Sequence, residues 1–447
     1  MKQFNIASFF SGIGGFDLAF ERAGFKVNFQ CEIQRFCRQV LEQHWPAVVL
    51  KHDIAAVSAP SIPDADVWCG GFPCQDLSVA RGSLGRHGLN GSRSGLFFRF
   101  ASLAERKKPR VIVIENVHGL LNSNDGKDFA ELLYTLERLN YAVSWRLLNS
   151  RYFGLPQSRP RVYICAWLKN PVAAGNVLFE SRRPIPAANE RSAFLETSWT
   201  SGAGPITPKV AFCLAATSGR HTGTDWSRTY VAYAGEARRL TPIECERLQG
   251  FPESWTELKN SSVDMEKSDS LRYHALGNAV SVKVVEWIAD RIRRGLQKDS
   301  ASRKHSRRKQ TFFLEALERW PGLNAPAKIS GDLSAVRRSR SKLVWPNAGI
   351  LWNGTFVAAR TPPTLQSPIY CDLLSIIERA RPDARYFLSP NAAEGILRRV
   401  DTQERHLFPP LRQALERLSG RQPTVQTIPA ASRQLSLHLP DTECVSP

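Results

Sequence analysis

The 447-residue sequence contains no run of about 18 apolar residues, the length that a helix needs to cross a bilayer. Its first residues, MKQFNIASFFSGIGGF, also lack the charged, apolar and small-residue regions of a secretion signal. The sequence shows no internal repeat. We therefore expect a globular, cytoplasmic protein that does not bind a membrane.

The nine cysteines form no CxxC pair, and their odd number argues against a closed disulfide framework. The nine histidines do not cluster with them at the spacing of zinc ligands, so no metal site is expected. Most of these thiols are therefore predicted to be buried and inert, which leaves room for a single reactive cysteine.

Positive charge is in excess and unevenly distributed, with a net charge of +19 for the whole chain. Residues 1–290 hold 34 basic and 28 acidic side chains, whereas residues 291–447 hold 26 and 13. Such an excess is typical of proteins that bind a polyanion, because each phosphate neutralised by lysine or arginine releases counterions. Basic proteins of other function are common, so charge indicates nucleic acid only together with other features.

The first 169 residues alternate short apolar runs with amphipathic helical patterns, which predicts an α/β domain with a mostly parallel sheet flanked by helices. The expected strands are Asn5–Phe10, Lys26–Cys31, Val67–Cys69, Arg110–Glu115, Ala142–Leu148 and Val162–Ala166. The expected helices are Phe16–Ala23, Arg35–Gln43, Leu96–Glu105 and Phe129–Leu139. Ligands of open α/β sheets bind beyond the carboxyl ends of the strands, where the chemistry is expected.

The rest of the chain divides by composition. Residues 170–237 are rich in Pro, Gly, Ser and Thr and predict a small insert. Residues 238–295 are helical, with Thr241 as an expected N-cap before Pro242, and return to the first domain. Residues 296–312 predict a basic linker, 313–420 a separate basic accessory domain, and 421–447 a disordered tail. Within the accessory domain, helices are expected near Leu373–Arg379, Asn391–Arg399 and Leu411–Leu418.

A glycine-rich turn, Phe10-Ser11-Gly12-Ile13-Gly14-Gly15, lies between the first expected strand and helix. Glycines let the backbone turn tightly and approach a ligand, although a plain connecting turn has the same appearance. Glu32 follows the second strand about 20 residues later, where a carboxylate can bind ribose hydroxyls. Asp53-Ile54 lies near a third strand end. The order of these features favours a nucleoside cofactor.

Cys74 lies in the stretch Gly70-Gly71-Phe72-Pro73-Cys74-Gln75, just past the expected strand Val67–Cys69. Any one cysteine is usually buried and structural, and placement on a loop among glycines and a proline weakens that interpretation. Glu115-Asn116-Val117 closes the next apolar strand, so its carboxylate is expected at the same sheet edge. Gln157-Ser158-Arg159-Pro160-Arg161 precedes a further strand, and alternation sends Arg159 and Arg161 to one side.

Taken in order, these motifs resemble the DNA cytosine-5 methyltransferase family over roughly the first 290 residues. FSGIGGF resembles its cofactor loop, GGFPCQ its nucleophile motif, and ENV and QSRPR its base-holding motifs. RRLTPIECERLQGFP resembles the segment that supports its recognition domain, and Gly277-Asn278-Ala279-Val280 its closing cofactor motif. The resemblance implies a Rossmann-like S-adenosylmethionine-dependent methyltransferase domain with a target-recognition insert.

The resemblance also implies a mechanism in which the cysteine adds to carbon 6 of cytosine and activates carbon 5 toward the sulfonium methyl. Cys74 takes this role, Glu115 holds N3 and the exocyclic amine, and Arg161 holds the O2 edge with Arg159 nearby. The base that removes the carbon 5 proton is not identified, and water can serve. S-adenosylmethionine is expected to contact Phe10, Ser11, Gly12, Ile13, Gly14, Gly15, Glu32, Asp53, Ile54, Pro73, Leu96, Asn278 and Val280.

The cytosine must leave the stack to reach these groups, so double-stranded DNA with a flipped base is the expected substrate. Ser78 to Ser94 corresponds to the loop that closes over DNA, and the insert corresponds to the part that reads bases. Expected DNA contacts are Gln75, Ser78, Arg81, Arg86, Arg93, Gln157, Arg220 and Arg228. The sequence departs from the family at Leu77, at Arg99, where an acid is frequent, and at Cys213-Leu214, where Thr often precedes Leu or Val.

Two alternatives remain open: a tRNA cytosine-5 methyltransferase of the same fold and a non-catalytic DNA-binding protein. The insert favours DNA, and the intact nucleophile motif favours an enzyme. We expect a monomer. The sequence does not show whether a cognate restriction endonuclease is a partner in a restriction–modification system. WPNAGI and YFLSP…GILRR resemble an accessory region of some phage-encoded cytosine methyltransferases.

Overall fold

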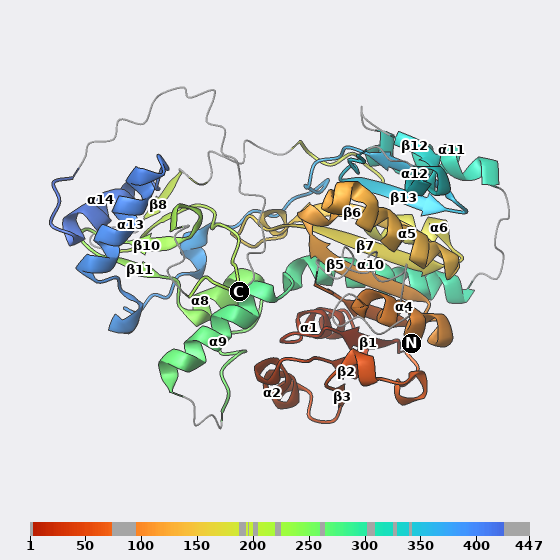
Figure 1. Ribbon diagram of the computed structural model, residues 1–447, viewed down its shortest axis with the longest axis horizontal. Coiled ribbons are helices and arrows are strands. Elements are labelled where there is room, and N and C mark those ends of the chain that lie inside the picture. The colour runs from red at the N-terminus through yellow and green to blue at the C-terminus, as the bar shows by residue number, and fades with distance from the viewer. Residues whose placement is uncertain are drawn as a thin grey trace.

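A ten-stranded mixed sheet forms the centre of the protein, seen in a computed structural model that describes residues 3–73, 95–186, 194, 196–199, 204–219, 225–259, 264–301, 309–324, 329–338 and 342–423. The strand order is β12-β14-β13-β6-β7-β5-β4-β1-β2-β3 (Figure 1). The strands are β1 (Asn5–Phe9), β2 (Lys26–Cys31), β3 (Val49–Lys51), β4 (Val67–Gly70), β5 (Val111–Val117), β6 (Tyr141–Asn149), β7 (Pro160–Leu168), β12 (Ile329–Asp332), β13 (Ala348–Trp352) and β14 (Thr355–Ala359).

The strands β3, β2, β1, β4 and β5 are parallel to one another, as the alternating pattern predicts. β7 instead pairs antiparallel with both β5 and β6. The connection from β6 to β7 carries only a short 3-10 turn, Ser150–Tyr152, and a parallel pair would need a longer crossover. As a result, the first residues of β7 lie beside the last residues of β5, with Arg161 opposite Val117.

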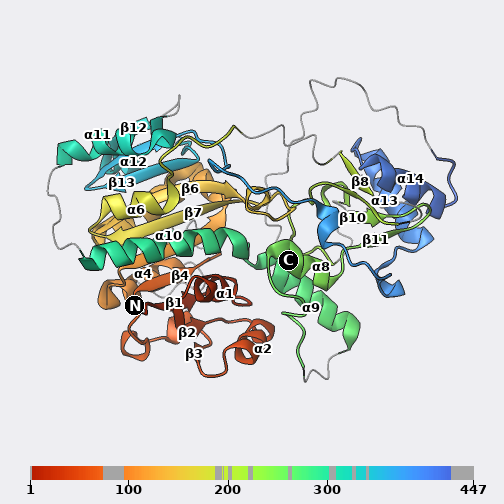
Figure 2. The same cartoon turned by 180° about the vertical axis from the view of Figure 1, so that it is seen from behind.

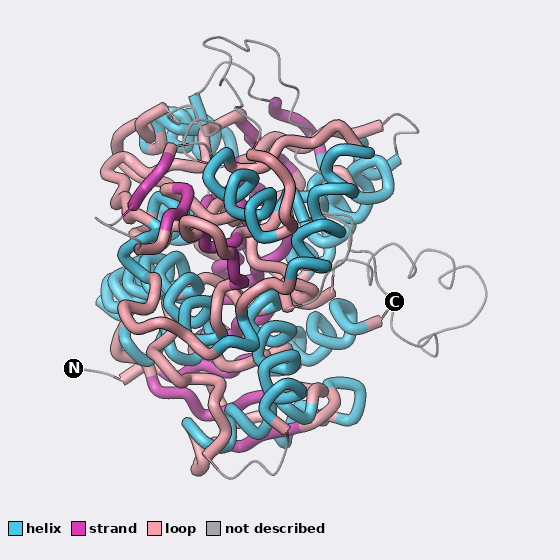
Figure 3. Tube along the Cα trace, turned by 90° about the vertical axis from the view of Figure 1, so that its left-hand side faces the viewer, coloured by secondary structure: helices cyan, strands magenta, loops and turns pink. Residues whose placement is uncertain are grey.

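Helices cover both faces of the sheet (Figures 1 and 2), and Figure 3 shows them on either side of the strands. Successive residues of each strand point to opposite faces: Val111 and Val113 join one buried apolar cluster, whereas Ile112 and Ile114 join the other. On one face lie α1 (Gly15–Arg22), α2 (Arg35–His44), α6 (Pro171–Leu178) and α10 (Val282–Ala301), and on the other lie α4 (Leu96–Lys107) and α5 (Lys127–Arg138).

A second, four-stranded antiparallel sheet forms the small domain, with the order β11-β10-β9-β8. Its strands are β8 (Thr197–Trp199), β9 (Ile206–Pro208), β10 (Tyr230–Ala232) and β11 (Ala237–Arg239). The insert was expected to begin at residue 170, but α6 packs on β6, β7 and α10 of the large sheet. The first domain therefore continues at least through Glu180, which binds buried Arg146 of β6.

Two helices connect the small domain to the large one, namely α8 (Pro242–Gln249) and α9 (Met265–Asn278). α8 begins with the predicted cap: Thr241 Oγ1 accepts the N–H of Glu244, and Glu244 accepts the N–H of Thr241 in return. α10 then packs against α1. It runs to Ala301, so the expected linker at 296–312 begins inside a helix, and α11 (Lys309–Arg319) occupies its other end.

The expectation of a separate C-terminal domain is wrong. β13 pairs with β6, and β14 and β12 extend the large sheet beyond it. Trp145 of β6 contacts Trp345, and both rings pack on Phe129 of α5. The chain continues as α13 (Pro390–Thr402) and α14 (Pro409–Leu418), which pack on the small sheet. α12 (Leu333–Arg338) lies beside α5.

The helices expected at 391–399 and 411–418 are present as α13 and α14, whereas Leu373–Arg379 forms only a 3-10 turn at Leu373–Ile376. Asp372 caps that turn by accepting the N–H of Leu374. The described cysteines form no disulfide with one another. Among the described residues, every helix is too short or too polar to span a membrane.

Candidate active site

The glycine-rich turn lies at the carboxyl end of β1, between β1 and α1. Gly12 and Gly14 have positive φ angles of 55° and 81°, which L-residues rarely adopt. A Cβ atom at Gly14 would lie 2.4 Å from the Trp45 ring, whereas one at Gly12 would meet nothing within 4 Å. The loop is therefore packed tightly on one side and open at Gly12.

Glu32 directly follows β2 and is fixed against this loop. Its Oε2 accepts the N–H of Gly12, and its Oε1 accepts the N–H of Gln34, both at 2.8 Å. Burial raises the pKa of the Glu32 carboxyl, and these hydrogen bonds oppose the shift. Asp53 is exposed and caps the next turn through Ala55 N–H, and Ile54 is buried beside it. An open glycine loop with a fixed carboxylate is suited to a nucleoside with free ribose hydroxyls.

The closing motif packs onto the glycine loop from a distant part of the chain. A Cβ atom at Gly15 would lie 2.7 Å from Cγ2 of Val280, so these two residues are in close contact. Asn278 and Pro73 are exposed, and Leu96 begins α4 near the same edge. Arg99, where the family often has an acid, donates to the carbonyl oxygens of Ile54 and Val57.

Asp17 lies buried beneath the cofactor loop and was not predicted from the sequence. Its Oδ2 is 3.0 Å from Ser8 Oγ, and its Oδ1 accepts from Gln30 Nε2 at 3.0 Å. Burial raises the pKa of Asp17 to about 6, and the two hydrogen bonds only partly oppose this shift. Because the folded protein holds the Asp17 proton more tightly than the unfolded chain, its contribution to stability is present at low pH and is lost as pH rises through 6.

Replacing Asp17 with Asn should remove this titration. Between pH 5 and 8 the wild type should lose about 1.5 kcal/mol more unfolding free energy than Asp17→Asn, as the raised pKa predicts. Denaturant unfolding of both proteins at the two pH values measures the difference. Parallel pH profiles for the two proteins would show that Asp17 is ionised throughout the range.

The described part of the nucleophile motif is held against the end of β5. Asn116 Nδ2 donates to the carbonyl oxygen of Phe72 at 3.0 Å, and the buried Phe72 ring packs on Phe97 of α4. A Cβ atom at Gly71 would lie 3.3 Å from both the carbonyl oxygen and Oε2 of Glu115. Only a residue without a side chain fits comfortably here, so the chain passes Glu115 closely on its way to Cys74.

Glu115 and Arg161 form the charged pair of the site because β5 and β7 are antiparallel. Arg161 Nε lies 3.2 Å from Glu115 Oε1, and both side chains are nearly buried. This ion pair lacks hydrogen-bond geometry, and Glu115 Oε1 has no hydrogen-bond partner among the described residues. Burial raises the pKa of Glu115, which Arg161 and Arg159 oppose. The carboxyl group thus keeps hydrogen-bonding capacity for a ligand and a tendency to hold a proton.

Arg159 lies beside this pair but is used differently from the expectation. Its guanidinium donates to the carbonyl oxygens of Leu214, Gly277 and Ala279 at 2.8–3.0 Å. Its side chain therefore joins the recognition insert to the closing motif. In this geometry Arg159 connects the segments that surround Arg161.

Gln157, an expected DNA contact, is buried in the described structure. Its side chain is fully buried, Nε2 donates to Leu248 and Gln249 of α8, and Oε1 accepts the N–H of Leu214. Arg228 is half-buried and donates to Thr217 Oγ1 at 3.1 Å. Seven expected site residues lie outside the described residues: Cys74, Gln75, Ser78, Arg81, Arg86, Arg93 and Arg220.

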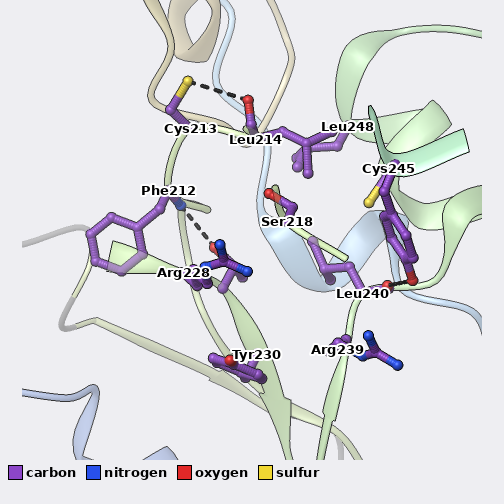
Figure 4. A pocket seen from close by; sticks show the side chains of 12 residues that line it. Phe212, Cys213, Leu214, Ser218, Arg228, Tyr230, Arg239, Leu240, Cys245 and Leu248 are labelled. Atoms are coloured by element: carbon purple, nitrogen blue, oxygen red, sulfur yellow. Dashed lines mark hydrogen bonds between the residues drawn. The ribbon is translucent and has the colours of Figure 1, made fainter. Parts of the chain in front are cut away.

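Cys213 occupies the position where the family often has threonine, and it meets both arginines of the motif. Its Sγ lies 3.3 Å from Arg159 Nη1 and 3.8 Å from Arg161 Nη2. Burial opposes ionisation of this thiol, but the two guanidinium groups lower its pKa below the ordinary value. Cys213 also lines a cavity of about 30 Å³, a size suited to water, with Cys245 on another wall (Figure 4).

A second residue that sequence reasoning missed is Trp255, which follows the GFP stretch after α8. Its Nε1 donates to the carbonyl oxygen of Ile13 at 2.8 Å, and its ring stacks on His44 of α2 at 3.5 Å between centroids. Trp255 thereby fixes the cofactor loop from a segment more than 200 residues away. An isolated tryptophan in a loop carries no periodic signal that could have predicted this contact.

A glycine loop and a fixed carboxylate at the carboxyl edge of an α/β sheet define an enzyme that binds a nucleoside cofactor. The chain belongs to the C-5 cytosine-specific DNA methylase family, whose profile matches residues 4–198 and 206–294. The protein therefore transfers a methyl group from S-adenosylmethionine to carbon 5 of cytosine in DNA. This family assignment confirms the resemblance in the sequence motifs.

Individual relatives agree with the family match. Type II methyltransferase M2.BsuMI of Bacillus subtilis (strain 168) is 33% identical over 304 residues, covering 64% of this chain and 75% of that protein. Type II methyltransferase M.DsaV of Dactylococcopsis salina is 33% identical over 321 residues, covering 65% and 86%. The crystal structure of the S. pombe Dnmt2 methyltransferase superposes with a TM-score of 0.51 at 20% identity, covering 66% of this chain and 99% of that one, which shows the shared fold.

Proposed function

We propose that the protein methylates a flipped-out cytosine in a specific sequence of double-stranded DNA, with Cys74 as a covalent nucleophile. The observation that carries this proposal is the approach of Gly71 to Glu115, three residues before Cys74. The thiol, the carboxyl group and Arg161 would then surround one base at the edge where the cofactor loop lies. A stacked base cannot enter such a site, so the cytosine leaves the helix at a cost of a few kcal/mol.

The bound S-adenosylmethionine supplies an electrophilic methyl group. The Cys74 thiolate adds to carbon 6, and the electron pair of the carbon 5–carbon 6 double bond becomes available at carbon 5. Glu115 holds N3 and the exocyclic amine and carries a proton to N3 as negative charge develops, for which a raised pKa is suited. Arg161 holds the O2 edge. After methylation a base removes the carbon 5 proton, the electrons of that bond expel the Cys74 thiolate, and N3 returns its proton to Glu115.

Glu32, the loop from Phe10 to Gly15 and Val280 would hold the cofactor. Glu32 is already oriented by Gly12 and Gln34 and would bind the ribose hydroxyls of the cofactor. The other residues expected to contact the cofactor would line the same edge, namely Asp53, Ile54, Pro73, Leu96 and Asn278. Arg159 and Cys213 hold Arg161 and the insert in place from behind.

A covalent trap tests the role of Cys74. DNA made with 5-fluorocytosine should give an adduct stable in SDS with the wild type and S-adenosylmethionine, because fluorine cannot be removed as a proton is. Cys74→Ser should give no adduct and no tritium transfer to ordinary DNA, while the matched variant Cys371→Ser keeps both. An adduct with Cys74→Ser, or transfer to tRNA and none to DNA, would refute the proposal.

A further inference from the structure

The residues beyond the family match return to the small domain. The match ends at residue 294, and the chain reaches the small sheet after β14. Asp372 accepts from Ser198 of β8, and Leu388 N–H donates to the carbonyl oxygen of Ala237 of β11 at 2.9 Å. In Figures 1 and 2 the blue helices α13 and α14 lie beside the green strands β10 and β11.

The buried apolar core of the small domain comes mainly from this C-terminal segment. Three buried members belong to the insert, namely Tyr230, Ala232 and Ala237. The other ten belong to the C-terminal segment: Leu388, Ala393, Ile396, Leu397, Val400, Leu407, Phe408, Leu411, Ala414 and Leu415. A four-stranded sheet with strands of three residues cannot bury enough apolar surface alone, so the two helices complete its core.

Two polar contacts join the same helices to the part of the insert expected to read DNA. Asp225 is fully buried, and Arg399 of α13 donates to its Oδ2 from Nε at 3.0 Å and from Nη2 at 2.8 Å. Tyr230 Oη donates to the other oxygen at 2.9 Å. The guanidinium of Arg405, in the turn between α13 and α14, lies 5.5 Å from the Trp226 ring. Asp225 and Trp226 directly follow residues 220–224 of the expected DNA-contacting segment.

We propose that the target-recognition domain is composite, and that residues 387–421 form its helical half and set DNA affinity and sequence selectivity. The helices provide the core on which β9, β10 and β11 lie, and Arg399 and Arg405 fix the start of the Asp225–Arg228 segment. The catalytic edge is formed by other elements, so the C-terminal segment acts on DNA readout and not on cofactor binding. This inference rests on the proposed DNA substrate and on the reading role of the insert.

Two neighbouring arginines of α13 provide a matched test in the full-length protein. Arg399→Met removes the guanidinium group that binds buried Asp225, whereas Arg398→Met makes the same change at an exposed position. After the wild-type sites are mapped on plasmid DNA, kcat/KM at those sites and the ratio to other cytosines are measured. Arg399→Met should lower kcat/KM at the mapped sites, and its ratio to the value at other cytosines, at least tenfold, while the Kd for S-adenosylmethionine stays unchanged. For Arg398→Met both quantities should stay within twofold of the wild type.

Equal kcat/KM and equal site selectivity for Arg399→Met and Arg398→Met would overturn the inference. Loss of cofactor binding by Arg399→Met would show that the fold of this variant is compromised. In that case Arg405→Ala tests the inference, because it removes the contact of an exposed arginine with Trp226. Arg405→Ala should then lower site selectivity at least threefold, and wild-type selectivity would contradict the proposal. A wild type that fails to methylate DNA would refute the DNA substrate and leave the composite core as it stands.

Discussion

Glu115→Gln should lower kcat for DNA methylation by about 10²- to 10⁴-fold, the range that proton transfer by a positioned side chain contributes. Glutamine has the shape of glutamate and can still form hydrogen bonds to a cytosine edge. It cannot carry a proton to N3 or balance the charge of Arg161, which lies 3.2 Å from Glu115. The Kd for S-adenosylmethionine should stay the same, because Glu32 and the glycine loop bind the cofactor in the proposed arrangement.

The pH dependence of kcat provides a second test of the Glu115→Gln variant. Burial raises the pKa of Glu115, so its carboxyl group keeps its proton to higher pH than an ordinary glutamate does. If the protonated form delivers the proton, kcat of the wild type falls as pH rises through this raised pKa. Glu115→Gln should lack that falling limb.

The matched control is Glu180→Gln, which also removes a buried carboxylate that faces an arginine. Glu180 Oε2 lies 3.3 Å from Arg146 Nη1, and both side chains are buried away from the catalytic edge. Both variants should lose unfolding free energy, because each leaves a buried or nearly buried arginine without its carboxylate partner. Only Glu115→Gln should lose kcat in single-turnover assays. A kcat within threefold of the wild type would exclude Glu115 as the proton carrier.

The placement of Glu115 at the carboxyl edge of the sheet was predictable because the signals are local. Short apolar runs with alternating helices identify the strands, and polar residues at their carboxyl ends meet at one edge of the sheet. The direction of β7 was not predictable in this way. Its apolar pattern reads the same in either direction, and only the short connection after β6 indicates an antiparallel pair.

The roles of Gln157 and Arg159 depend on partners that are distant in the sequence. Gln157 contacts residues near 214 and 248, and Arg159 contacts residues near 214 and 278. Motif position alone predicts catalysis or DNA binding for such residues. Their contacts with distant segments become visible only in the folded structure. The C-terminal strands were missed for the same reason. β13 pairs with β6 about 200 residues earlier, and composition carries no signal for such pairing.

Gly277→Ala should lower the unfolding free energy by about 1–3 kcal/mol, the typical effect of forcing extra volume into a packed core. Gly277 lies inside α9, where alanine ordinarily stabilises a helix by about 1 kcal/mol relative to glycine. Here a Cβ atom would lie 2.2 Å from the backbone of Ala215 and Ala216. Backbone atoms cannot rotate away as a side chain can, so the steric effect outweighs helix propensity.

The same substitution should reduce kcat/KM for DNA by about 10²-fold, because small displacements of catalytic groups are costly. The carbonyl oxygen of Gly277 accepts from Arg159 Nη2 at 3.0 Å, and the displaced segment carries Cys213, which contacts Arg159 and Arg161. Gly235→Ala is the control, since a Cβ atom there meets nothing within 4 Å. Denaturant unfolding and tritium transfer measure both effects. Stabilisation by Gly277→Ala with full activity would mean that the insert and the closing motif are not held together at this contact.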